Sequence, residues 1–393
     1  MTNKKESKIY IGEWFQRTVL HLREIFNFLK TGSSPLDRLD KQKLKENLKK
    51  LKIEKVEMVI NNLTFLKFST ESGINVKIFE DGLVVLNKEI ENKPEKDMKD
   101  LSSYYEYILR PSLSYLFSLG MPLSKKLIGT RIVSPFFVVL NNESEKKALS
   151  FLKKFKEEKK LTIKNKKFEI YRGNKIYIIN NIKEDKNNIE KFINEQIFIR
   201  EFISQMHRYL NLHRVVWEKI DDLKAQGKIK GKEVKKLKEQ IEGYGKKVDL
   251  IEARICQMKI SVKKRMILAQ NDKEFQNLAK VLEFKYNALL DTLDYIKEIW
   301  GTTKDYVNST RKILEKIRIQ STEQSLKSLS VLTSMSLFAS LIKLSSRGTP
   351  DFDAFGLIYL VLLIFVGYIA NKIMTAISMN KSYKVKNIKI PKE

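Results

Sequence analysis

The sequence predicts an α+β cytoplasmic domain followed by long coiled-coil helices and a C-terminal two-helix transmembrane hairpin. Three observations lead to this fold class. Segments rich in Val, Ile and Phe are concentrated in residues 51–182, residues 136–349 contain no proline, and residues 354–371 carry no charged side chain. Proline costs about 3 kcal/mol inside a helix, so the proline-free tract permits long helices.

The net charge of the chain is +28, from 75 Lys and Arg against 47 Asp and Glu. A charge of this size is compatible with nucleic acid or an anionic membrane surface as a partner. The Lys residues are spread through the whole chain, however, and the sequence has no zinc-finger spacing, no RNP-like aromatic motif and no compact Arg cluster. We therefore expect no nucleic-acid partner.

Residues 1–50 are expected to form an amphipathic helix and a linker. Apolar residues recur at helical spacing from Ile11 to Leu29, with basic residues between them. Two alternatives stay open for this helix: it packs on the next domain, or it lies on a membrane surface. The single cysteine, Cys256, excludes an internal disulfide, and its place in an apolar helical stripe predicts a core residue.

Residues 51–182 are expected to form the α+β domain. The segments with strand composition are 53–60, 63–68, 74–79, 83–86, 132–140, 168–171 and 175–179. Asp81-Gly82 stands between two of them and indicates a two-residue hairpin, because type I′ turns need positive φ. Helical patterns at 101–119 and 143–159 separate the strands.

Residues 183–327 are expected to form a long helical stalk. From Val234 to Val262, apolar residues alternate at spacings of three and four, which is typical of a coiled-coil seam. Apolar residues also recur at spacings of three and four between Ile199 and Leu223, and His213 occupies the one position of this stripe that lacks an apolar residue. It is expected to be a packed core residue rather than a ligand.

The predicted transmembrane hairpin occupies residues 328–374, with spans at 328–345 and 354–372, and a basic tail follows at 375–393. Six Lys and Arg lie in residues 304–327 and six in residues 372–393, whereas the connecting loop holds only Arg347. Cytoplasmic flanks of membrane spans are enriched in Lys and Arg. Both termini are therefore expected in the cytoplasm, with the chain in the cell membrane as a multi-pass protein.

One face of the first span carries the candidate pore-lining residues, which are Thr333, Ser336, Ser340 and Lys343. A stripe of hydroxyl groups has two explanations: close packing between helices, or a water-filled path. The external loop adds Gly348, Asp351 and Asp353, and its two carboxylates would attract a cation.

The order of these parts over residues 51–393 resembles the CorA-like superfamily of two-span divalent metal ion transporters. The run EQSLKSLSVLTSMSLF, at the entry to the first span, is similar to the family's sequence there, whereas the family's Gly-Met-Asn signature is absent and residues 345–350 read SSRGTP. The resemblance implies a homo-oligomeric channel whose first span lines the pore, with a divalent cation such as Mg²⁺ as the transported ion.

Two functions follow from the sequence. The first is an oligomeric CorA-like divalent cation channel, or a divergent relative, in a lipid bilayer. The alternative is a membrane-anchored coiled-coil scaffold or sensor without transport activity. An enzyme is not expected, and neither is a cofactor: His207 and His213 do not have the i, i+4 spacing of a zinc pair, and no phosphate-binding loop, GxSxG or kinase motif occurs.

Overall fold

The computed structural model describes most of the chain up to residue 347. The described residues are 7–15, 21–37, 39–90, 93–117, 136–164, 166–174, 176–225, 227–273 and 275–347, together with residues 382–384 and scattered positions between 358 and 380. They divide into two compact units. The sheet unit comprises Met1–Arg208 and Arg254–Asp294, and the helical unit comprises Tyr209–Ala253 and Tyr295–Glu393.

Within the described part of the chain, nine strands of the sheet unit pair in the order β2-β3-β4-β5-β1-β6-β9-β8-β7. The strands are β1 (Lys8–Trp14), β2 (Ile53–Val59), β3 (Phe65–Thr70), β4 (Asn75–Phe79), β5 (Leu83–Glu89), β6 (Phe136–Asn141), β7 (Leu161–Lys164), β8 (Phe168–Arg172) and β9 (Ile176–Asn181). Neighbouring strands are antiparallel except β6 and β9, which run parallel. The prediction of strands in an α+β domain is confirmed.

The β4–β5 hairpin forms at the predicted place, but the connection is three residues long, from Glu80 to Gly82, and Asp81 does not have the positive φ of a type I′ turn. Gly82 has a φ of 94°, which L residues rarely adopt, and a Cβ there would lie 2.0 Å from the backbone oxygen of Phe15. The Gly82 carbonyl accepts a hydrogen bond from the backbone N–H of Phe15 at 2.8 Å. The turn therefore also fixes the end of β1.

The N-terminal segment differs from its prediction, because Lys8–Trp14 is a strand rather than part of an amphipathic helix. It lies between β5 and β6, and its residues from Ile9 to Trp14 are buried on both faces of the sheet, including Glu13, whose carboxylate accepts a hydrogen bond from the hydroxyl of Tyr105. A helix does follow at Leu22–Thr31, and its apolar face is buried in the core of the domain. Of the two alternatives for this helix, packing on the domain is therefore the one observed.

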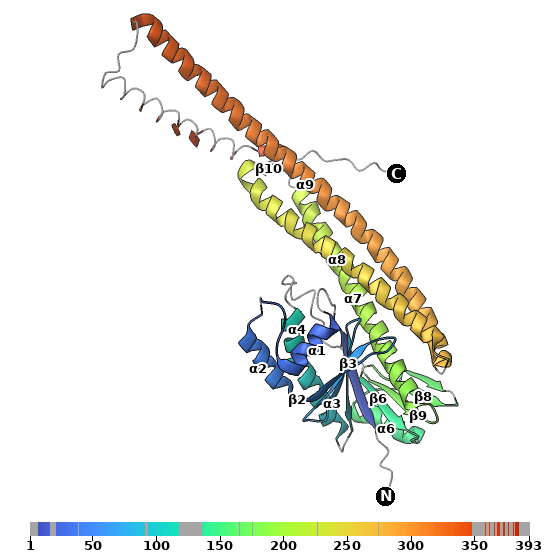
Figure 1. The fold of residues 1–393 in the computed structure, drawn as a ribbon. Helices are drawn as coiled ribbons and strands as arrows, with labels where there is room; N and C mark the ends of the chain where they lie inside the picture. Colours follow the sequence, from blue (N-terminus) through green and yellow to red (C-terminus); the bar gives the residue numbers. More distant parts are fainter. Residues whose placement is uncertain are drawn as a thin grey trace, which may run out of the picture. The chain divides into compact units, whose positions relative to one another are not determined.

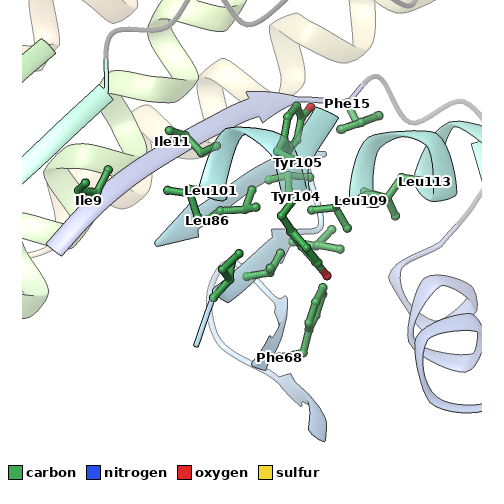
Figure 2. Close-up of a cluster of buried hydrophobic side chains, with 14 of the residues drawn as sticks. Ile9, Ile11, Phe15, Phe68, Leu86, Leu101, Tyr104, Tyr105, Leu109 and Leu113 are labelled. Carbon is green, nitrogen blue, oxygen red and sulfur yellow. The ribbon is translucent and has the colours of Figure 1, made fainter. Parts of the chain in front are cut away.

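One face of the sheet is covered by short helices (Figure 1). They are α1 (Leu22–Thr31), α2 (Lys41–Leu51), α3 (Pro94–Tyr104), the π-helix η1 (Tyr105–Leu109), α4 (Arg110–Phe117) and α6 (Glu145–Lys154). Figure 2 shows how Ile9, Ile11 and Leu86 of the strands meet Leu101 and Leu109 of the helices in one apolar cluster.

The opposite face is covered by the first part of α7 (Lys186–Ala225) (Figure 1). Here Trp14 packs against Phe202 with ring centroids 4.6 Å apart. The approach is close enough that a Cβ on Gly12 would lie 2.9 Å from Cγ2 of Ile197. Glycine in β1 therefore allows α7 to sit directly on the strand.

The helical unit is built from parts of three long helices: α7, α8 (Gly231–Asn271) and α9 (Gln276–Arg347). The residues of the predicted seam are mostly buried, with Ile241, Val248 and Ile251 at 1% exposure or less. Burial alone does not establish a coiled coil, which stays a prediction. A short ladder pairs β10 (Lys228–Lys230) with β11 (Ser382–Lys384).

The prediction for Cys256 is wrong, because this side chain is exposed on α8. His213 is partly buried, with its ring centroid 5.8 Å from that of Trp217 and 5.9 Å from that of Trp300. It is packed against aromatic rings, as expected.

The predicted transmembrane hairpin is wrong. In the described residues, none of the helices combines the length and the apolar character that are needed to cross a membrane. The first predicted span, 328–345, lies inside α9, where Ser and Thr residues and Lys343 interrupt the apolar sequence. Most of the second span, 354–372, lies outside the described residues. The predicted multi-pass location in the cell membrane depended on the hairpin and is overturned with it.

Candidate ligand cavity in the sheet unit

The structure does not assemble the pore-lining residues that the sequence singled out. Thr333 and Ser340 are exposed on α9, and the Thr333 hydroxyl donates to the backbone oxygen of Ser330 at 2.9 Å. Ser336 and Lys343 belong to α9, but their side chains are not among those described. The loop candidates Gly348, Asp351 and Asp353 lie outside the described residues. Among the residues that are described, no group of His, Cys, Asp and Glu could hold a metal ion.

A different site lies within the sheet unit, where a cavity of about 920 Å³ opens between the sheet edge and two helices. Its walls come from the β2–β3 loop at residues 60–63, the end of β4, the first part of α7, the end of α8 and the turn after α8. The polar side chains in these walls are Asn61, Asn62, Lys191, Asn194, Glu195, Arg265, Asn271 and Asp272.

Arg265 is the central charged residue of this site, and its side chain is 1% exposed. Its Nε donates to Oδ2 of Asp81 at 2.5 Å, and its Nη1 donates to Oε1 of Glu195 at 2.5 Å. The guanidinium carbon lies 4.4 Å from the ring centroid of Phe198 and 5.3 Å from that of Phe79. Such planar stacking with two carboxylate partners suits Arg and not Lys.

The charges of this cluster depend on one another. Burial disfavours the charged guanidinium, but Asp81 and Glu195 outweigh this cost and raise the pKa of Arg265 above its ordinary value. Burial also raises the pKa of Glu195, although Arg265 and the hydroxyl of Tyr286, which donates to this carboxylate, oppose the shift. An ion cluster of this kind is costly to break, because each member would be left charged in a dry environment.

The local sequence explains how the cluster is positioned. Asp81 is held in the β4–β5 turn, where its Oδ1 accepts from the backbone N–H of Leu83 at 3.1 Å and its carbonyl accepts from Nε1 of Trp14 at 2.7 Å. Glu195 and Arg265 project from α7 and α8 toward this turn. One short turn and two helices thus fix all three ionic groups.

Two residues that line the cavity each have one buried polar atom without a hydrogen-bond partner: Nη2 of Arg265 and Oδ1 of Asn194. The two residues are 2% and 8% exposed. An unsatisfied buried polar group costs about 1–3 kcal/mol, so most such groups in proteins are paired. Both atoms have almost no accessible surface, so neither lies open to the cavity, and the accessible polar groups of its walls are Asn61, Asn62, Lys191, Asn271 and Asp272.

The rim of the cavity carries a further ion pair, between Nζ of Lys191 and Oδ2 of Asp272 at 2.5 Å. Asp272 also accepts from the backbone N–H of Phe275 at 3.2 Å, which holds the turn after α8. Among these residues, the carboxylates of Asp81, Glu195 and Asp272 face the cations of Arg265 and Lys191. The site therefore has no excess positive charge.

Sequence reasoning missed this site, although one signal was present. The alternation of three and four residues in the seam does not end at Val262 but continues to Arg265 and Ala269. Both residues are buried. A charged residue on an otherwise apolar stripe indicates a buried ion pair or a binding site.

No family model, curated protein or solved structure matches this chain. The resemblance to the CorA-like superfamily consequently stays a prediction from the order of the parts.

Proposed function

We propose that this chain is a ligand-binding sensor or scaffold protein without catalytic or transport activity, and that its sheet unit binds a small polar molecule in the cavity at Arg265. The observation that carries the proposal is the cavity itself, whose walls hold the buried Arg265 between Asp81 and Glu195, beside Asn194. Its volume of about 920 Å³ lies within the range of small-molecule sites.

The chemistry of the walls favours binding over catalysis. The described lining contains no His, Cys, Ser, Thr or Tyr, and its carboxylates, Glu195 and Asp272, are both held in ion pairs. Its cationic groups, Arg265 and Lys191, are held in ion pairs with carboxylates. These groups are suited to recognising a molecule and not to exchanging protons with it.

The helices that carry the site support the role of a sensor. Asn194 belongs to α7 and Arg265 to α8, and both helices continue along the chain into the helical unit. A ligand that orders these side chains would act on the same helices that form the helical unit.

Divalent cation transport is not proposed, because it required the transmembrane hairpin. A homo-oligomer and the absence of a nucleic-acid partner stay predictions.

The test is the thermal stability of the purified full chain in the presence of a library of small metabolites. A ligand at a hundred times its Kd should stabilise the protein by about 2.7 kcal/mol. The variant Asn194→Leu should lose this response. It should also be about 1 kcal/mol more stable than the wild type without ligand, because it removes a buried oxygen that has no partner.

The matched control is Asn187→Leu, since Asn187 is an exposed asparagine on the same helix and does not line the cavity. It should respond to ligand as the wild type does. Retention of the full ligand response by Asn194→Leu would contradict the proposed site, and so would a library in which no compound stabilises the wild type.

A further inference from the structure

The strand β7 stands at one end of the sheet order and presents an open edge. It pairs with β8 on one side, and no described strand pairs with it on the other. Alternate N–H and C=O groups of an edge strand point outward, where they can pair with a further strand. We propose that this edge binds an extended acidic segment of a partner protein, which adds to the sheet as one more strand. The edge is separate from the cavity at Arg265, which β7 does not line.

The strand at the opposite end of the order, β2, lacks the features of a docking edge. Its register is irregular between Ile53 and Lys55. Its Glu57 forms ion pairs with Lys55 at 2.6 Å and with Lys67 at 2.8 Å, so its charges are balanced within the sheet. Bulges and charged side chains are means by which proteins protect edge strands.

The exposed side chains of β7 are apolar at alternate positions. Leu161 is 48% exposed and Ile163 is 45% exposed, and the register of β7 against β8 is regular over all four residue pairs. Residues two apart in a strand lie on the same face of the sheet. A strand added at this edge would therefore cover both side chains with alternate side chains of its own, while its backbone supplies the hydrogen bonds.

The surroundings of this edge are strongly basic. Residues 153–167 contain two glutamates and eight lysines, all of the lysines exposed: Lys153, Lys154, Lys156, Lys159, Lys160, Lys164, Lys166 and Lys167. Three carboxylates from elsewhere in the sheet unit approach them, since Glu145 and Glu169 pair with Lys164, and Glu184 pairs with Lys167. The lysines still outnumber all these carboxylates, so the surface attracts an anionic partner.

The same lysines disfavour a second copy of this chain as the added strand. Antiparallel pairing of two β7 strands that sets Leu161 opposite Ile163 of the other copy would also set Lys160 opposite Lys164. Like charges directly opposite each other in a sheet are destabilising. A nucleic acid would neutralise the lysines, but its phosphates would leave the strand edge unpaired and the two apolar side chains uncovered.

The edge therefore specifies the pattern of its partner. In an antiparallel addition, the residues opposite Leu161 and Ile163 should be apolar and β-branched, because these fit a pleated surface. The residues opposite Lys160 and Lys164 should be Asp or Glu. The expected segment is extended, with two apolar residues separated by one residue and an acidic residue on each side of them.

The experiment measures fluorescence anisotropy of a labelled synthetic peptide, with the core Glu-Val-Thr-Val-Glu, on addition of the purified full chain. The peptide should bind, and its affinity should fall as salt is raised, because exposed charges act through a screened field. A peptide with the core Lys-Val-Thr-Val-Lys should bind about tenfold more weakly or not at all.

Peptides methylated on one backbone nitrogen test the strand addition itself. Successive N–H groups of a strand point to opposite sides, so only one of two neighbouring nitrogens faces β7. Methylation of the first Val or of the Thr should therefore weaken binding about tenfold in one peptide and change it little in the other.

Variants of the chain locate the binding surface. The double variant Leu161→Thr with Ile163→Thr keeps β-branched side chains at exposed positions but removes apolar surface, and it should weaken peptide binding about tenfold. Ile60→Thr, at an isoleucine of the β2–β3 loop that is 80% exposed, should leave binding unchanged. Lys160→Glu should also weaken binding, whereas Lys41→Glu, at an exposed position of α2, should not.

Several outcomes would overturn the proposal. The first is equal affinity for the acidic and the basic peptide, and the second is full affinity in the Leu161 and Ile163 double variant. Binding of a single-stranded oligonucleotide or of phosphatidylserine vesicles that the double variant retains, without peptide binding, would identify a purely electrostatic surface instead. A dimer of the wild type that the double variant loses in analytical ultracentrifugation would assign the edge to a second copy of the chain.

Discussion

Each unit of the molecule contains a cation held over an aromatic ring, but the two arrangements differ in burial. In the sheet unit, Arg265 stacks on Phe198 and is enclosed with two carboxylates. In the helical unit, Nζ of Lys224 lies 3.6 Å from the ring centroid of Tyr306, whose hydroxyl donates to Asp221 at 3.0 Å. Trp217 stacks on the same ring, with a centroid distance of 4.4 Å.

The difference lies in access to water. Asp221 is exposed, so solvent screens its interaction and can replace either partner. Arg265 has no such alternative, because its side chain is 1% exposed. We therefore expect the sheet unit to depend strongly on its ionic cluster, whereas the helical unit depends on its apolar stripe and only weakly on its charges.

The largest effect is expected for Arg265→Met in the sheet unit. The substitution keeps much of the side-chain volume but leaves Asp81 and Glu195 without their shared partner. Breaking a buried ionic cluster in this way costs about 3–5 kcal/mol. Urea unfolding measures the loss, with Lys263→Met, an exposed residue of the same helix, as the control. A loss below about 1 kcal/mol would mean that the cluster does not behave as a buried one.

The second largest effect is expected for Ile251→Asp in the helical unit. Ile251 is 1% exposed, so the new carboxylate would be buried without a partner, and the expected loss is about 3 kcal/mol. The control is Ala253→Asp, which adds the same group at an exposed position two residues away. Equal unfolding free energies for the two variants would show that the stripe is not packed.

A smaller effect is expected for Asp221→Asn, which tests the exposed cluster. The free energy of unfolding should change by less than about 1 kcal/mol, because exposed charge partners contribute little. Burial, aided by the hydrogen bond to Asp221, raises the pKa of Tyr306 to about 12, and the substitution should lower this pKa. NMR titration of ¹³C-labelled tyrosine measures the shift. Asp222→Asn, at the exposed neighbouring residue, should leave it unchanged.

The smallest effect is the response of the helical unit to acid through His213. Burial lowers the pKa of His213 below its ordinary value of about 6.5, so the folded state holds this proton less tightly than the unfolded state does. Stability should therefore fall as the pH is lowered from about 6.5 toward the folded pKa, and be fully present above that window. His213→Gln should flatten the profile of unfolding free energy against pH, whereas His207→Gln, at an exposed position, should not. An unchanged slope for His213→Gln would contradict this origin.

Local patterns predicted the strands of the sheet and the hairpin at Asp81-Gly82, because composition and turn chemistry act over a few residues. They failed for β1, since a strand buried on both faces has no alternation and its apolar residues also match a helical period. The run at 354–371 predicted a span because it is apolar and uncharged, but most of it lies outside the described residues, and the helix at Ser328–Ile342 contains too many Ser and Thr residues to pair with it.

The candidate site could not be predicted from sequence spacing. Arg265 lies 184 residues from Asp81 and 70 residues from Glu195, so only the folded sheet and helices bring these groups together. The unpartnered atoms of Arg265 and Asn194 leave no trace in the sequence at all. What the sequence did contain was a charge on a buried stripe, which locates one residue of the site but none of its partners.

The central place of β1 has a consequence for folding and solubility. In the sheet order, β2 to β5 lie on one side of this strand and β6 to β9 on the other, so β1 alone joins the two halves through hydrogen bonds. Removing Lys8–Trp14 would expose the edges of β5 and β6, which are apolar strands with unpaired N–H and C=O groups. Such edges recruit strands from other molecules. A shortened chain should therefore aggregate even though it keeps every other strand of the sheet.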